Sequence, residues 1–228
     1  MEEKFLEPVR KLDVILADSL LPAGAPSFQR LFKLSSQIVE LRSLLTPAIM
    51  EKICALQNNP LGFLTDRPTG YDMDTIRDCT IWATCNGLSM VGNQVNIIAG
   101  RGYATKEGLK QKLLSIQGLS FSVVHGIPTL REQGAVVTTR VEWQYNGEKS
   151  SQELTLPIRV NKGMGADAVL GKATRKAYAW LLEKISGTNV ADGDASDMVD
   201  LRTGEKVKRD DNKIFDTNRE DGKMFEVK

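Results

Sequence analysis

The sequence predicts an α+β fold in which an antiparallel β-sheet or hairpin packs with helices. Two observations carry the core of this prediction: apolar residues recur at helical spacing in the first sixty residues, and they alternate on both sides of Asn146-Gly147. Apolar residues are sparse near the C-terminus, where the chain cannot bury enough surface to order itself. We therefore expect a helical arm over residues 1–59, a core over 60–187 and a flexible charged tail over 188–228.

The arm is predicted to hold two helices. The longer spans residues 27–57, with Ser27 as N-cap and Pro47 as a kink or end. A shorter helix between Phe5 and Leu21 should break near Pro8, and a Pro- and Gly-rich linker follows it. The apolar residues at helical spacing in the longer helix are Phe28, Leu31, Leu34, Ile38, Leu41 and Leu45. Such faces need a partner, so we expect the arm to supply contacts between copies of the chain.

A helix, a strand, a basic turn and a basic helix are expected next. Residues 72–87 read as a helix with an aspartate cap and a glycine stop. A short strand, Val95–Ala99, leads into the turn Gly100–Gly102, and Thr105 caps the second helix. The apolar face of that helix consists of Leu109, Leu113 and Ile116, and its lysines, Lys106, Lys110 and Lys112, lie away from this face.

The β region consists of a strand over 119–126 and a hairpin whose turn is Asn146-Gly147. Period-two alternation puts one face of each arm toward the core and leaves Arg140 and Glu142 on the other. The expected core-facing residues are Val137, Thr139, Val141, Trp143 and Tyr145 in the first arm and Leu154, Leu156, Ile158 and Val160 in the second.

The last predicted helix is amphipathic and follows Gly163 and Gly165, which allow close approach of the backbone to a partner. At 100° per residue, its cations Lys172, Arg175 and Lys176 gather on the flank of one apolar stripe. The stripe consists of Ala166, Leu170, Ala173, Ala177, Trp180 and Leu181. We expect Trp82, Trp143 and Trp180 to be core residues.

The formal net charge is +1, but the charged residues are unevenly distributed along the chain. Residues 99–181 hold 12 basic and 6 acidic side chains, whereas residues 187–228 hold 8 basic and 11 acidic.

Cys54, Cys79 and Cys85 have neither paired spacing nor a histidine cluster, which favours reduced core thiols. No signal pattern or long apolar run is present, so we expect a cytoplasmic protein without membrane contact.

Catalytic and nucleotide-binding motifs fit poorly. A Walker loop needs a five-residue step between its glycines and a hydroxyl after the lysine, but Gly165 lies six residues before Gly171, and Ala173 follows Lys172. The glycine spacing over 100–108 does not match a dinucleotide loop.

Asp72, Asp74 and Asp78 could bind a metal for nuclease chemistry, but capping of a helix N-terminus is the ordinary role of such residues. His125 lies in an apolar strand as a structural histidine. The pattern favours a non-catalytic protein with no cofactor and no metal site of its own, although Mg²⁺ can accompany DNA.

Several cationic segments with an aromatic residue between them are typical of proteins that bind the nucleic-acid backbone and stack its bases. No zinc finger, basic zipper or clear helix-turn-helix is seen, which favours single strands bound without sequence preference. The candidate DNA-binding residues are Arg101, Tyr103, Lys106, Lys110, Arg159, Lys162, Lys172, Arg175 and Lys176. Phosphates would be bound by the cations, and Tyr103 would support an unstacked base.

The run TIRDCTIWATCNGLSMVGNQVNIIAGRGYATKEGLKQKL, a β-hairpin and then GKATRKAYAWLLEKISG resemble the core of the phage RecT/Redβ single-strand annealing proteins. The resemblance covers about residues 60–187 and rests on the order of elements and on local pattern. It places the family's late-helix lysine, which alanine follows, on Lys172-Ala173, and the family's turn before the second helix on Arg101-Gly102-Tyr103.

The resemblance implies ATP-independent annealing of complementary strands in phage recombination. The expected partners are single-stranded DNA, the annealed duplex intermediate and further copies of the chain in a ring or helical filament. By analogy, a phage exonuclease and a host single-strand-binding protein are candidate partners of the tail. Two alternatives stay open: an ATP-dependent recombinase or helicase accessory, and a nucleoprotein scaffold that binds DNA without speeding annealing.

Overall fold

The computed structural model describes residues 3–19, 28–131, 134–161 and 163–187, and it confirms the α+β class. Ser27, the predicted linker and the predicted tail lie outside these ranges. The helices are α1 (Glu3–Ser19), α2 (Phe28–Leu44), α3 (Pro47–Cys54), α4 (Met73–Cys85), α5 (Lys106–Leu114) and α6 (Ala166–Ser186). The strands are β1 (Val95–Ile98), β2 (Arg101–Ala104), β3 (Ser120–His125), β4 (Thr129–Arg131), β5 (Gly134–Tyr145) and β6 (Glu148–Ile158).

The larger sheet is antiparallel and is organised around β5. Strand β6 pairs with β5 along its length, and β3 and β4 pair with successive parts of β5. The β5–β6 turn is the predicted Asn146-Gly147, where φ is +52° and +85°. The predicted inward face is confirmed, since Val137 lies opposite Leu156 and both face the core. Side chains of the opposite face, such as Arg140, are exposed.

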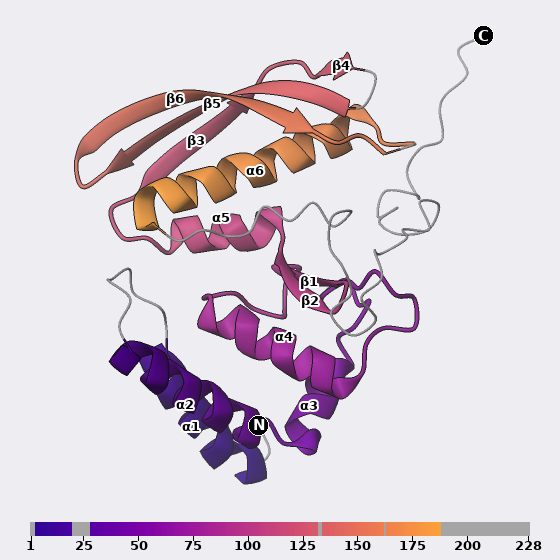
Figure 1. The fold of residues 1–228 in the computed structure, drawn as a ribbon, viewed down its shortest axis with the longest axis vertical. Helices are drawn as coiled ribbons and strands as arrows, with labels where there is room; N and C mark the ends of the chain where they lie inside the picture. Colours follow the sequence, from indigo (N-terminus) through magenta and orange to yellow (C-terminus); the bar gives the residue numbers. More distant parts are fainter. Residues whose placement is uncertain (1–2, 20–27, 132–133, 162, 188–228) are drawn as a thin grey trace.

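Helix α6 is a central layer and not a surface helix. Figure 1 shows it between the larger sheet and α5, with β1, β2 and α4 on the far side of α5. The predicted single apolar stripe is therefore incomplete. Ala173 and Leu181 are buried as expected, but Ala166 is exposed. A second set of buried residues, absent from the predicted stripe, is Val169, Arg175, Ala179 and Leu182.

The N-terminal helices follow the sequence prediction with one exception. Helix α1 continues through Pro8 instead of breaking there. Pro47 separates two helices as predicted, because it begins α3 and supplies no N–H to α2. The core is continuous across the expected boundary at residue 60, since Leu41, Leu45 and Met50 belong to the same buried cluster as Phe63.

Caps define α4 and α5 as the sequence predicts. Asp72 Oδ1 accepts the backbone N–H of Thr75 at 2.8 Å, and Thr105 Oγ1 accepts that of Gly108 at 3.2 Å. The expected turn at Gly100–Gly102 is wrong, because Arg101 already begins β2 and the turn is Ala99-Gly100. Within the described ranges, no helix has the length and apolar character needed to cross a membrane.

Aromatic residues join these layers. The predicted core positions of the three tryptophans are confirmed, since all pack partly buried against the main cluster. Trp143 and Trp180 meet edge to face at 5.6 Å between ring centroids, which attaches α6 to β5. Trp82 of α4 lies against Gly102 so closely that a Cβ there would be 2.2 Å from the ring. Glycine at this position therefore lets β2 pack on α4.

Candidate nucleic-acid interface

The cations predicted to bind DNA come from β2, α5, the end of β6 and α6. Six of these candidates lie on β2, directly after β6 and on α6, and we refer to them together as the β2–α6 site: Arg101, Tyr103, Arg159, Lys172, Arg175 and Lys176. Lys106 and Lys110 are exposed on α5, which packs against α6. Lys162 lies outside the described residues. The structure thus brings segments far apart in the sequence to one helix.

Arg175 is the largest departure from the sequence prediction. Its side chain is 7% exposed, Nε donates to the carbonyl oxygen of Ala104 at 2.9 Å, and the guanidinium lies 4.1 Å from the ring centroid of Tyr103. The expected solvent-facing position is wrong because Arg175 lies about 200° around the helix from Ala173, on the side that faces β2. Arg175 therefore positions Tyr103 and attaches α6 to β2 instead of presenting its charge to solvent.

Lys172 and Lys176 lie one turn apart on α6, and both are half-buried. Lys172 Nζ donates to the backbone carbonyl oxygen of Arg159 at 2.9 Å, which attaches the start of α6 to the end of β6. The Arg159 side chain itself is exposed. The resemblance-based placement of a phosphate contact on Lys172 therefore falls on a lysine that also has a structural bond.

Arg101 has a buried donor without a partner in the described part of the chain. The residue is half-buried, and among the residues that the structure describes its buried Nε finds no acceptor. A charged donor left without a partner costs about 1–3 kcal/mol or more when it is buried. Arg101 is therefore a candidate position for an anionic ligand, which guanidinium groups bind through their N–H donors.

A hydrogen-bond network that sequence reasoning missed fixes the turn before Arg101. The Tyr71 hydroxyl donates to Asp66 Oδ1 at 2.7 Å and accepts the N–H of Gly100 at 2.9 Å, while Asp66 Oδ2 accepts the N–H of Ala99 at 3.0 Å. Ala99 is a buried residue with φ +53°, a conformation that costs about 1–2 kcal/mol outside glycine. No local signal marks this network, because a tyrosine five residues after an aspartate is an ordinary loop pattern.

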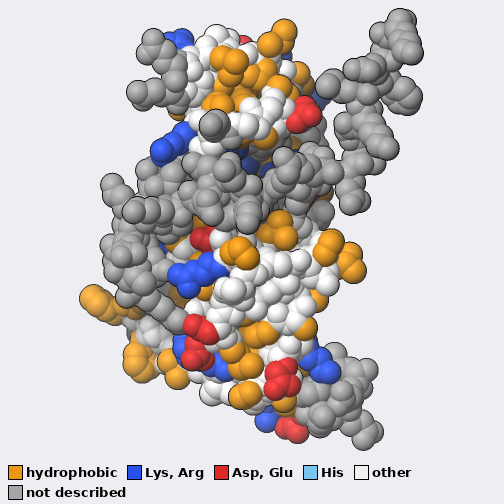
Figure 2. All heavy atoms as spheres, turned by 90° about the vertical axis from the view of Figure 1, so that its right-hand side faces the viewer, with side chains coloured by type: hydrophobic (Ala, Val, Ile, Leu, Met, Phe, Trp, Pro, Cys, Tyr) orange, Lys and Arg blue, Asp and Glu red, His pale blue; other side chains and the backbone are white. Residues whose placement is uncertain are grey.

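Electrostatics at the neighbouring elements modifies the expected basic cluster. Lys106 Nζ lies 4.0 Å from Glu107 Oε1, so this carboxylate balances part of the lysine charge. Lys112, counted as basic in the sequence, is half-buried, and burial lowers its pKa. On the uncovered part of the face in Figure 2, Lys and Arg side chains lie in separate groups among apolar and acidic ones. On this face, the visible cations therefore do not form one uniform basic surface.

The three aspartates that could have suggested a metal site have structural roles. Asp72 caps α4, Asp74 pairs with Arg77 at 2.6 Å, and Asp78 pairs with Arg42 of α2. The described residues contain no cluster of three potential metal-binding side chains.

The cysteines are free, and burial raises the pKa of Cys79 to about 12, which keeps this thiol protonated.

His125 is a satisfied structural histidine, as predicted. Its Nδ1 and Nε2 each lie 2.8 Å from a threonine hydroxyl, of Thr139 in β5 and Thr174 in α6. Because the Thr174 hydroxyl donates to the Leu170 carbonyl at 2.9 Å, it accepts from Nε2–H, and Nδ1 accepts from Thr139. The neutral ring therefore joins β3 to β5 and to α6.

We expect the free energy of unfolding to fall with acidification because of His125. Burial lowers its pKa below the ordinary value of 6.5, so the unfolded chain binds the proton more tightly. The stabilisation is complete above about pH 6.5 and is lost as the pH falls through the folded-state pKa. Urea unfolding across this range checks it, and since the chain has one histidine, His125→Gln should remove this slope. An unchanged slope in that variant would contradict the assignment.

Apart from the buried Arg175, the β2–α6 site contains the cations Arg101, Arg159, Lys172 and Lys176 and the half-buried ring of Tyr103. These residue types suit a polyanion that also carries flat rings. Comparison of the chain with family models, curated proteins and solved structures finds no match. The resemblance to the RecT/Redβ proteins therefore stays a prediction that rests on the quoted residues.

Proposed function

We propose that this chain binds single-stranded DNA and anneals complementary strands without ATP, as a non-catalytic protein of phage recombination. Arg101 is the residue that carries the proposal, since it is a half-buried cation whose Nε has no acceptor among the described residues, and an anion would balance its charge. A backbone phosphate supplies one without sequence preference. The surplus of basic residues over 99–181 favours a polyanion over an isolated phosphate.

We propose different roles for the predicted DNA-binding residues according to their exposure. Lys106, Lys110 and the side chain of Arg159 are exposed and would contact phosphates. Arg175 is withdrawn from this set because it is buried. Tyr103 is half-buried with one ring face under Arg175, so base stacking there is restricted to the rest of the ring. Annealing requires that phosphates are held while Watson–Crick edges stay free for the second strand.

Arg101→Ala is expected to weaken binding of a labelled single-stranded oligonucleotide about tenfold, because it removes a charge-assisted hydrogen bond to phosphate. It should also reduce the slope of log affinity against log salt by about 0.7 for each phosphate that the variant no longer binds. Fluorescence anisotropy at several salt concentrations measures both quantities.

Arg140→Ala is the matched control for Arg101→Ala. Arg140 lies on the open face of β5 and pairs with Glu142 at 2.8 Å, so its removal should leave affinity and salt slope unchanged. Equal binding by wild type and Arg101→Ala would remove Arg101 from the interface, and a salt-insensitive wild type would contradict phosphate binding as a whole.

A further inference from the structure

The turn between β1 and β2 contains a residue that is poorly suited to it. Ile98 pairs with Arg101, so Ala99-Gly100 alone join the two strands, with φ of +53° and +71°. A two-residue turn with positive φ at both positions favours Asn-Gly, Asp-Gly or Gly-Gly. The β5–β6 turn follows this rule with Asn146-Gly147, whereas the β1–β2 turn has alanine at the first position. Ala99 is therefore held in a strained backbone conformation.

Two side chains from the loop between α3 and α4 hold this turn. Asp66 Oδ2 accepts the N–H of Ala99, and the Tyr71 hydroxyl accepts that of Gly100. The same hydroxyl donates to Asp66 Oδ1, so one connected network satisfies both N–H groups of the turn. Burial and the hydrogen bond to Asp66 raise the pKa of Tyr71 above its ordinary value, so its hydroxyl stays protonated and keeps donating. The guanidinium of Arg67 lies 4.6 Å from the centroid of the Tyr71 ring.

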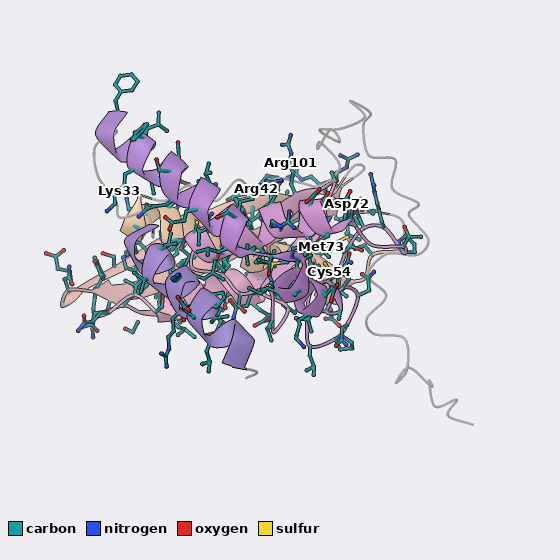
Figure 3. The ribbon with its side chains drawn as sticks, turned by 90° about the horizontal axis from the view of Figure 1, so that it is seen from below. Lys33, Arg42, Cys54, Asp72, Met73 and Arg101 are labelled. Atoms are coloured by element: carbon teal, nitrogen blue, oxygen red, sulfur yellow. The ribbon has the colours of Figure 1, made fainter. Side chains whose placement is uncertain are left out.

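Arg101 comes directly after this turn. The N–H of the residue before it is bonded to Tyr71, and Gly102 after it packs against the Trp82 ring, so the backbone is fixed on both sides. In Figure 3, Arg101 lies near the start of α4, which Asp72 caps. The Arg101 Nε is buried and has no acceptor among the described residues. Strained residues persist only where their surroundings enforce them, and they cluster at functional sites. Here the strain lies next to the residue on which DNA binding is proposed to depend.

From these contacts we infer that Tyr71 and Asp66 are positioning residues for DNA binding, which hold the strained turn so that Arg101 is presented to a backbone phosphate. This role rests on the proposed function. Without the Tyr71 hydroxyl, Ala99 relaxes to negative φ, and turns of that kind splay the two strands apart. Arg101, as the first residue of β2, then shifts away from the phosphate. Tyr71 thus acts through Arg101 and needs no contact of its own with DNA.

Tyr71→Phe tests this role because it removes the hydroxyl and keeps the ring. Fluorescence anisotropy of a labelled single-stranded oligonucleotide should show binding about fivefold weaker than that of wild type, the effect of losing one net hydrogen bond. In the Arg101→Ala background the same change should have no further effect, because two residues that act through one contact are not additive. Asp66→Asn, which leaves a single acceptor oxygen for the two donors, should behave like Tyr71→Phe.

Rescue by Ala99→Gly separates positioning from a general loss of stability. Glycine adopts positive φ without strain, so the turn no longer needs the hydroxyl. The double variant Tyr71→Phe with Ala99→Gly should therefore bind DNA like wild type. Ala104→Gly is the matched control at the other end of β2, since Ala104 and Ala99 are 1% and 2% exposed and each change removes a buried methyl group. Ala104→Gly should not restore binding to Tyr71→Phe.

Three results would overturn the positioning role. They are a Tyr71→Phe variant that binds DNA like wild type, a loss that adds fully to that of Arg101→Ala, and an Ala99→Gly change that restores no more binding than Ala104→Gly. Weaker binding by Arg101→Ala beside unchanged binding by Tyr71→Phe would overturn this role alone. A wild type that does not bind the oligonucleotide would remove the proposed function together with it, so the two failures are distinguishable.

Discussion

Gly108→Ala is expected to lower the free energy of unfolding by about 3 kcal/mol. A Cβ at this position would lie 2.2 Å from the backbone carbonyl oxygen of Gln94. That oxygen cannot turn away as a flexible side chain could, because it also accepts the N–H of Thr105 at 3.0 Å. The roughly 1 kcal/mol by which alanine ordinarily improves on glycine in a helix is therefore outweighed. Chemical denaturation followed by circular dichroism measures the change.

Gly171→Ala in α6 is the control, and it is expected to raise the free energy of unfolding instead of lowering it. No atom lies within 4 Å of a Cβ added at Gly171, so the helix propensity of alanine should stabilise the protein by roughly 0.5–1 kcal/mol. The contrast isolates the contact between α5 and the start of β1 from general effects of glycine in helices. If Gly108→Ala were as stable as wild type, the close docking of these segments would be contradicted.

Arg175→Ala should destabilise the protein by about 3 kcal/mol. The change removes a cation–π contact with Tyr103 and leaves the Ala104 carbonyl oxygen without its donor, in a region where both partners are buried. Arg175→Lys should also be destabilising, because ammonium lacks the planar face that lies over the ring. Thermal or urea unfolding measures these changes.

Lys176→Ala is the neighbouring control, with an expected change within about 1 kcal/mol because Lys176 is only half-buried. A double variant of Arg175 and Lys176 would mix loss of packing with loss of charge, so single variants are needed to interpret DNA binding. An Arg175→Ala variant as stable as Lys176→Ala would contradict the buried role of Arg175.

Local signals predicted much of the fold. Asp72 and Thr105 cap helices where the sequence places them, and Asn146-Gly147 makes the expected turn between β5 and β6. Period-two alternation assigned the inward face of β5 correctly, since Val137 and Val141 are fully buried. These features depend on residues close together in the chain, which explains why the sequence alone reveals them.

The features that the sequence did not predict depend on tertiary contacts. Arg175 is buried because β2 and α5 cover the side of α6 that a single-stripe wheel leaves to solvent. The Asp66–Tyr71 network and the pairing of β4 with β5 join segments with no periodic or motif signal. Among the candidate site residues, exposed Lys106 and Lys110 follow the prediction, whereas the environment of Arg101 could only be seen in three dimensions.

The rate at which complementary oligonucleotides pair in the presence of this protein tests the central claim most directly. Duplex formation, followed by fluorescence quenching, should accelerate equally with and without ATP, and Arg101→Ala should reduce the acceleration. If the protein binds DNA but does not change the rate of duplex formation, the nucleoprotein-scaffold alternative is favoured. Acceleration that requires ATP would leave a recombinase or helicase accessory, and either result would contradict ATP-independent annealing.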